Sequence, residues 1–170
     1  MIRTLLALLM LLPAIPAHAT LAAPGSVEEL ARSSQAVVRG RVARVASRWS
    51  EDQRRIFTYV DLDVSSAWRG APGSRVTIIV PGGVVGGMGQ RVDGAPGFAK
   101  GEDVVAFLSE AEEGAYRVTG LAQGKFNVEG SAARPDVSHV SFVEAPLRAG
   151  ERRAEAMDVA ELERRVRSVK

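Results

Sequence analysis

The sequence predicts a mainly β protein: a small OB-like Greek-key barrel of five or six strands, with a short N-terminal helix and a C-terminal helix. Several short valine-rich segments alternate apolar and polar residues, a pattern typical of strands. Fourteen of the 17 glycines lie between Gly70 and Gly130, the region with most of the expected strand boundaries. Short strands with glycine bends favour a curved, closed sheet. A β-sandwich is the second choice.

Composition excludes several classes of site. The chain has 170 residues and no cysteine, so it has no thiol nucleophile, zinc–thiolate site or iron–sulfur cluster. Its two histidines are His18 and His139. We expect His18 to be removed, which excludes a multi-histidine metal site. We therefore expect no metal, no cofactor and no enzymatic activity.

Residues 1–19 have the three regions of a secretory signal peptide. Arg3 precedes an apolar run from Leu5 to Leu12, and Ala17-His18-Ala19 forms an A-x-A cleavage site. A buried N-terminal helix is the alternative. Cleavage after Ala19 would make Thr20 the first residue of an exported protein, periplasmic or extracellular. No later apolar run is long enough to span a bilayer.

Two helices are expected to flank the barrel. Ser26 and Glu29 form a capping box, which predicts a helix over about 27–33. An apolar stripe after Gly150, bordered by arginines, predicts the second helix. The predicted organisation is thus a barrel domain over 20–149 and a C-terminal helix over 150–170.

Two alternating segments, 36–45 and 56–64, are predicted to pair as a hairpin. Pairing apolar residues on one face and opposite charges on the other defines the register. A bulge near Ala43 would shift it. The register sets Val42 opposite Val60, Gly40 opposite Leu62, Arg41 opposite Asp61 and Arg39 opposite Asp63. Further strands are expected over 75–80, 103–108, 116–121 and 125–129, with a weaker candidate over 137–143.

The segment from Gly82 to Gly89 is the strongest candidate for a functional element. Five of its eight residues are glycine, namely Gly82, Gly83, Gly86, Gly87 and Gly89. It lacks the Lys and following helix of a phosphate-binding loop. Its apolar residues Val84, Val85 and Met88 have no evident place in a strand register. We consider two roles, contact with a protein partner and a structural turn.

Gln123 and Lys125 are secondary candidates. They lie in the compact segment Gly120-Leu-Ala-Gln-Gly-Lys-Phe126. Both side chains are suited to ligand contact. The alternative, which we favour, is a barrel corner whose glycines permit a bend.

The arginine-rich region before Phe57 raises the question of nucleic-acid binding. A barrel that binds single strands needs a basic groove and exposed aromatic rings, for which Trp49, Phe57 and Tyr59 are candidates. However, 22 Lys and Arg residues nearly balance 20 Asp and Glu residues. Ion pairs with Asp61 and Asp63 are the favoured explanation, and they would keep both carboxylates ionised and unsuited to general acid catalysis.

Several segments resemble the netrin-like module, in particular the N-terminal domain of the tissue inhibitors of metalloproteinases. These segments are Ala36-Val-Val-Arg-Gly-Arg-Val42, Phe57-Thr-Tyr-Val-Asp-Leu-Asp-Val64, Trp68-Arg-Gly70, Val76-Thr-Ile-Ile-Val80 and Glu102-Asp-Val-Val-Ala-Phe-Leu108. The chain is also similar to secreted bacterial proteins that share the glycine-rich loop. The resemblance implies an OB barrel that blocks a protease cleft with its N-terminus and an adjacent loop. In the inhibitors a disulfide-bonded N-terminal cysteine chelates the zinc. Here Thr20 would stand in that place, without a disulfide.

The resulting hypothesis is an exported, non-enzymatic module that binds a protein partner, with a peptidase as one candidate. Its predicted contact surface is Thr20 with the 82–89 loop. The alternative is an OB-type binder of oligosaccharide or single-stranded nucleic acid. The oligomeric state stays open.

Overall fold

The structure is a computed structural model that describes residues 25–136 and 154–169. The elements that build the barrel are β1 (Ala36–Trp49), β2 (Ile56–Arg69), β3 (Arg75–Pro81), β6 (Asp103–Glu110) and β7 (Tyr116–Val118). A separate hairpin consists of β4 (Gly83–Val85) and β5 (Met88–Gln90). The remaining elements are α1 (Val27–Arg32), β8 (Lys125–Glu129), β9 (Ala132–Pro135), β10 (Met157–Asp158) and α2 (Val159–Arg167), with short 3-10 turns over Glu112–Gly114 and Leu121–Gly124.

Five strands form a closed barrel. Their order is β1-β2-β3-β7-β6, and the antiparallel pairing of β6 with β1 closes it. The β3–β7 pairing is parallel, whereas the other pairings in the barrel are antiparallel. This order is OB-like. The predicted fold class, including the short N-terminal helix and the C-terminal helix, is confirmed.

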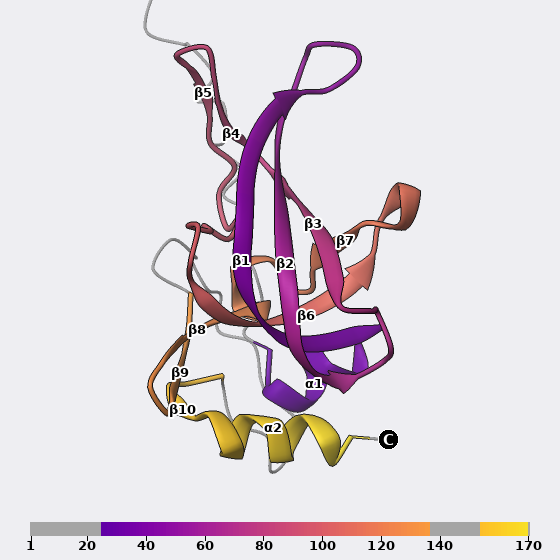
Figure 1. The fold of residues 1–170 in the computed structure, drawn as a ribbon, viewed down its shortest axis with the longest axis vertical. Helices are drawn as coiled ribbons and strands as arrows, with labels where there is room; N and C mark the ends of the chain where they lie inside the picture. Colours follow the sequence, from indigo (N-terminus) through magenta and orange to yellow (C-terminus); the bar gives the residue numbers. More distant parts are fainter. Residues whose placement is uncertain (1–24, 137–153, 170) are drawn as a thin grey trace, which may run out of the picture.

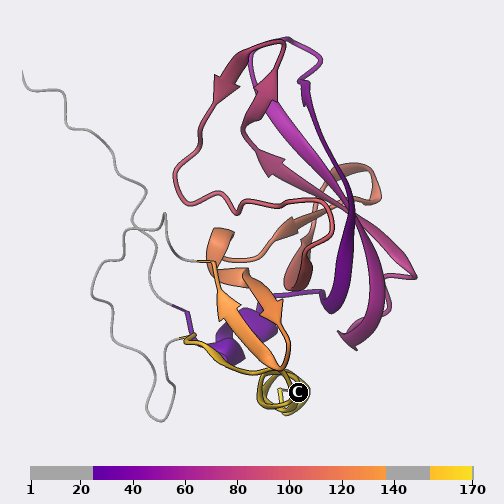
Figure 2. The ribbon, with the colours of Figure 1, turned by 60° about the vertical axis from the view of Figure 1, so that its left-hand side comes forward.

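A short sheet extends from the barrel wall toward the C-terminal helix. β8 pairs with β6, β9 pairs with β8, and β10 pairs with β9. In Figure 1 the β4–β5 hairpin lies at one end of the long axis and α2 at the other. Figure 2 shows α2 nearly end-on, below the β8–β9 sheet.

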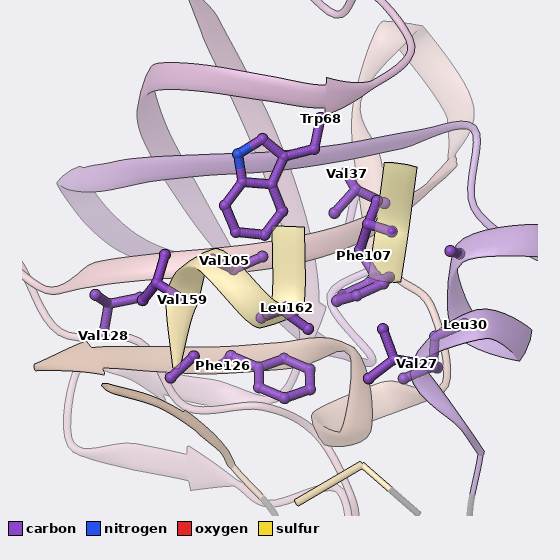
Figure 3. Close-up of a cluster of buried hydrophobic side chains, with 13 residues drawn as sticks. Val27, Leu30, Val37, Trp68, Val105, Phe107, Phe126, Val128, Val159 and Leu162 are labelled. Atoms are coloured by element: carbon purple, nitrogen blue, oxygen red, sulfur yellow. The ribbon is translucent and has the colours of Figure 1, made fainter. Parts of the chain in front are cut away.

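Two hydrophobic cores share β1 and β6. Val38 and Val104 belong to the core inside the barrel, whereas their neighbours Val37 and Val105 belong to a second core outside it. In the second core, Leu162 of α2 packs with the barrel residues and with α1 (Figure 3). Because both faces of β6 are buried, its sequence reads as a nearly continuous apolar run over 104–108, whereas β1 is buried on both faces only at its start, over 36–38.

The caps of both helices follow from the sequence. The Ser26 hydroxyl accepts a hydrogen bond from the Glu29 backbone N–H at 3.1 Å, as the capping box predicts. In the second helix, Asp158 accepts from the Ala160 N–H at 2.8 Å. Within the predicted 150–170 region, the described helix therefore begins at Val159, directly after strand β10.

The predicted register of the β1–β2 hairpin is wrong by two residues over 40–42 and by three over 44–49. Val42 lies opposite Leu62, Arg41 opposite Asp63, and Gly40 opposite Val64. A bulge at Ala43, between Val42 and Arg44, contributes to the shift. Over 40–42 the shift of two keeps the side chains on their predicted faces, because the period of a strand is two, and over 44–49 the bulge accounts for the additional residue. Val42, Val60 and Leu62 are accordingly buried.

The charged partners differ from the prediction because β1 pairs with β6 as well as with β2. Arg39 binds Asp103 of β6, with Nη2 at 2.7 Å from Oδ2. Asp61 lies 3.5 Å from Arg44, and Asp63 lies 2.7 Å from Arg75. The later strands lie where they were predicted, except that β7 ends at Val118. The candidate strand over 137–143, with His139, lies outside the described residues.

Candidate binding surface

The glycine-rich segment is an ordered hairpin. Its turn consists of Gly86 and Gly87, whose φ angles are +56° and +82°. Two positive φ angles in a two-residue turn are typical of the type I′ turn, which glycine adopts without strain. Val85 pairs with Met88 directly before and after this turn.

Side chains from the barrel hold the base of the hairpin. The Gly82 N–H donates to the Ile56 carbonyl at 2.8 Å, and the Thr58 hydroxyl donates to the Gly82 carbonyl at 2.7 Å. Gln90 Oε1 accepts from the Ile56 N–H at 2.6 Å. A Cβ at Gly83 would lie 2.4 Å from the hydroxyls of Ser47 and Thr58, so this close approach requires glycine. The hairpin is therefore fixed at its base and free at its tip.

The tip presents apolar side chains to solvent. Val84 is 66% exposed and Met88 is 58% exposed, and these are the large hydrophobic side chains that are exposed in the described ranges. Val84 lies opposite Gly89, whereas Met88 lies opposite Val85. Because successive residues of a strand point to opposite faces, Val84 and Met88 extend from opposite faces of the hairpin. A partner that grips the tip would contact apolar surface on both sides.

Thr20, the other half of the predicted contact surface, lies outside the described residues. Its position beside the hairpin stays a prediction. The described chain begins at Gly25, whose N–H donates to Gln123 Oε1 at 2.8 Å.

Gln123 and Lys125 are both buried. Gln123 is 5% exposed and accepts the Gly25 hydrogen bond; the Lys125 side chain is 2% exposed. Lys125 Nζ donates to the Gly97 carbonyl and lies 3.1 Å from Glu102 and 3.5 Å from Asp136. These contacts favour the structural role, in which Lys125 connects the loop before β6 to the end of β9.

The arginine-rich region forms stacked pairs on the outer face of the barrel. The Arg48 guanidinium lies 3.7 Å from the centre of the Tyr59 ring, and the Arg55 guanidinium lies 5.9 Å from that of Phe57. Such cation–π contacts cover ring faces that a base would need for stacking. The expectation that Asp61 and Asp63 pair with arginines is confirmed, with Arg44 and Arg75 as the partners.

Electrostatics at the barrel surface stabilise charged side chains in ion pairs. The hydrogen bond that Arg39 donates to Asp103 raises the pKa of Arg39, and the one that Arg75 donates to Asp63 raises the pKa of Arg75. In residues 25–136 and 154–169, no group of His, Asp and Glu side chains has the geometry of a metal site. In the same ranges, no helix is long and apolar enough to cross a membrane.

The sequence did not identify the residues that position the hairpin. Ser47 lies near the end of β1 and Thr58 near the start of β2, where both look like ordinary strand residues, and Gln90 looks like a polar loop residue. Their shared role depends on the curvature of β1 and β2, which no local pattern encodes. No known protein family matches the chain, and no curated protein matches it.

Proposed function

We propose that the protein is an exported, non-enzymatic binding module that contacts a protein partner through the β4–β5 hairpin. One observation carries the proposal: Val84 and Met88 are exposed at the tip of a hairpin whose base is held by the barrel. Large apolar side chains at a projecting tip are typical of residues that a partner covers.

The geometry favours binding with a low entropic cost. A type I′ turn and the hydrogen bonds at the base order the hairpin before any partner arrives. Less conformational freedom is then lost on binding than with a disordered loop. Met88 adds a flexible thioether side chain that adapts to an irregular surface.

A netrin-like relationship, with a peptidase as the partner, is the finer form of this proposal. The closed five-strand barrel supports it, because the netrin-like module is an OB barrel. In this form the hairpin and the N-terminus at Thr20 would together enter a protease cleft. In the absence of cysteine, no disulfide would fix the free amine of Thr20 at a catalytic metal.

Export is part of the proposal and is tested separately. Mass spectrometry of the protein secreted by the producing cells should show Thr20 at the N-terminus. A soluble cytoplasmic product that retains Met1 would contradict it.

The hairpin is tested by a charge substitution at its tip. The double variant Val84→Glu/Met88→Glu should lose partner capture from the extracytoplasmic fraction and any inhibition of a panel of purified peptidases. Its fold should persist, because both side chains are exposed. The matched control is Ala71→Glu/Ser74→Glu, two exposed positions in the β2–β3 connection. Equal capture by both variants would contradict the proposal.

The alternative, an oligosaccharide or single-strand binder, receives less support. Such a binder stacks its ligand on exposed aromatic faces, whereas Arg48 covers the ring of Tyr59. A salt titration distinguishes a single-strand binder from the proposed module, because binding to a phosphate backbone weakens steeply with salt.

A further inference from the structure

We infer that a cleft in the outer wall of the barrel is a second binding site, which takes a short peptide with one carboxylate beside apolar side chains. The cleft has a volume of about 450 Å³, within the usual range of ligand sites. This inference does not depend on the role of the hairpin.

The cleft forms where the barrel wall opens. β7 has three residues and pairs with β3 through Ile78 and Tyr116 alone. Beyond this pair, β3 continues through Ile79 to Pro81, and these residues line the cleft. Phe57 and Tyr59 extend the lining across β2, because they lie opposite Pro81 and Ile79. The floor is thus apolar and built on strands.

A strained residue forms part of the lining. Leu121 has φ +58°, a left-handed conformation that is uncommon for a residue with a side chain. The conformation is held by the turn, in which the Ala122 N–H donates to the Gly94 carbonyl at 2.9 Å. Strain of this kind concentrates at binding sites, where it fixes a side chain in a needed position. Here it keeps an aliphatic side chain at the cleft.

The charges at the cleft favour an anionic group. Arg55 and Arg117 line it together with one carboxylate, Glu112. Neither arginine forms an ion pair with any residue in the described ranges. An arginine that is not already in an ion pair is available to bind a carboxylate through two parallel hydrogen bonds.

The aliphatic lining distinguishes a peptide from a nucleic acid. Ile79, Pro81 and Leu121 accommodate apolar side chains, whereas a nucleic-acid strand requires a row of cations and open ring faces. The cleft has two arginines rather than a row of cations, and Arg48 covers the ring of Tyr59. A peptide with one acidic and one or two apolar side chains matches both the shape and the charge.

The probe is acetyl-Leu-Pro-Glu-amide, compared with acetyl-Leu-Pro-Gln-amide by NMR titration of the isotopically labelled protein. We expect the acidic peptide to shift the resonances of Tyr59, Ile79 and Leu121 with a dissociation constant of roughly 0.1–1 mM. The glutamine peptide should bind about tenfold more weakly. Equal affinity of the two peptides, or the absence of shifts at the cleft, would overturn the inference. Tighter binding of a short oligothymidine at the same residues would also overturn it.

Two cleft variants test the roles of the arginines and of Leu121. Arg55→Gln/Arg117→Gln should remove the preference for the acidic peptide, whereas the control Arg134→Gln, at an exposed arginine on β9, should keep it. Leu121→Gly should weaken the binding of both peptides. It should not lower the midpoint of thermal unfolding, because glycine adopts this φ freely. Unchanged peptide affinity in either cleft variant would overturn the inference.

Discussion

Arg165 in α2 and Glu28 in α1 form a bidentate ion pair, with Nε 2.6 Å from Oε1 and Nη2 2.7 Å from Oε2. The two side chains are 17% and 24% exposed, so solvent screens the pair only in part. It joins helices from the two ends of the described chain, and both helices contribute to the core outside the barrel. The pair therefore couples α2 to the fold.

Glu28→Gln should lower the free energy of unfolding at about pH 7 by about 1.5 kcal/mol, the lower end of the range for hydrogen bonds to charged groups. The hydrogen bond from Arg165 lowers the pKa of Glu28. A lowered folded-state pKa stabilises the protein above the ordinary glutamate range, and this stabilisation is lost as pH falls through the lowered pKa. Urea unfolding at neutral and acidic pH should show the difference between wild type and variant disappearing in acid. A difference that persists in acid would contradict the assignment.

Gln90→Ala should loosen the hairpin without unfolding the barrel. The variant leaves the Ile56 N–H without its side-chain acceptor, at a cost of about 1–3 kcal/mol. Amide hydrogen exchange should increase at residues 83–90 and stay unchanged in β6. Unchanged exchange in the hairpin would show that Gln90 does not hold it.

Val60→Asp should unfold the domain, whereas Arg41→Gln should leave it folded. Val60 is fully buried inside the barrel, and an unpaired charge there costs several kcal/mol of a total stability of roughly 5–15 kcal/mol. Arg41 is exposed and donates a 3.4 Å hydrogen bond to the Gly101 carbonyl. Circular dichroism distinguishes the two variants. A cooperative, wild-type-like thermal transition for Val60→Asp would refute the placement of Val60.

Lys125→Met should destabilise the protein by about 1–3 kcal/mol, because Glu102 and Asp136 lose a buried cation. The loss should appear as a lower midpoint in urea. The control Lys100→Met removes an exposed lysine from the loop before β6, near Glu102, and should change the midpoint little. Equal effects of the two substitutions would show that the buried contacts of Lys125 contribute no stability.

The sequence was sufficient to predict a barrel, because the alternation of apolar and polar residues in β2 reflects one buried and one solvated face. It was insufficient for the register, since the bulge at Ala43 and the pairing of β1 with β6 are set by closure of the barrel. The apolar run in β6 reflects burial on both faces, but nothing in it indicates that the two helices cover the outer face.

The sequence predicted where the candidate site lies, but it did not predict that the segment forms an ordered hairpin. Glycine content indicated residues 82–89, but the order of the hairpin depends on Thr58 and Gln90, which are distant from one another in the sequence. The cleft is harder still to foresee. Arg55, Ile79 and Leu121 come from three separate segments, and the left-handed conformation of Leu121 leaves no trace in its residue type.

Site-specific photo-crosslinking in the producing cells tests most directly whether the hairpin is the partner-contacting element. A photoreactive amino acid replaces Val84 in one variant, Met88 in a second and exposed Arg134 in a third. We predict a discrete adduct of higher mass from positions 84 and 88, and none of that mass from position 134. The same adduct from position 134, without any from 84 or 88, would contradict the proposal and place the contact surface elsewhere on the barrel.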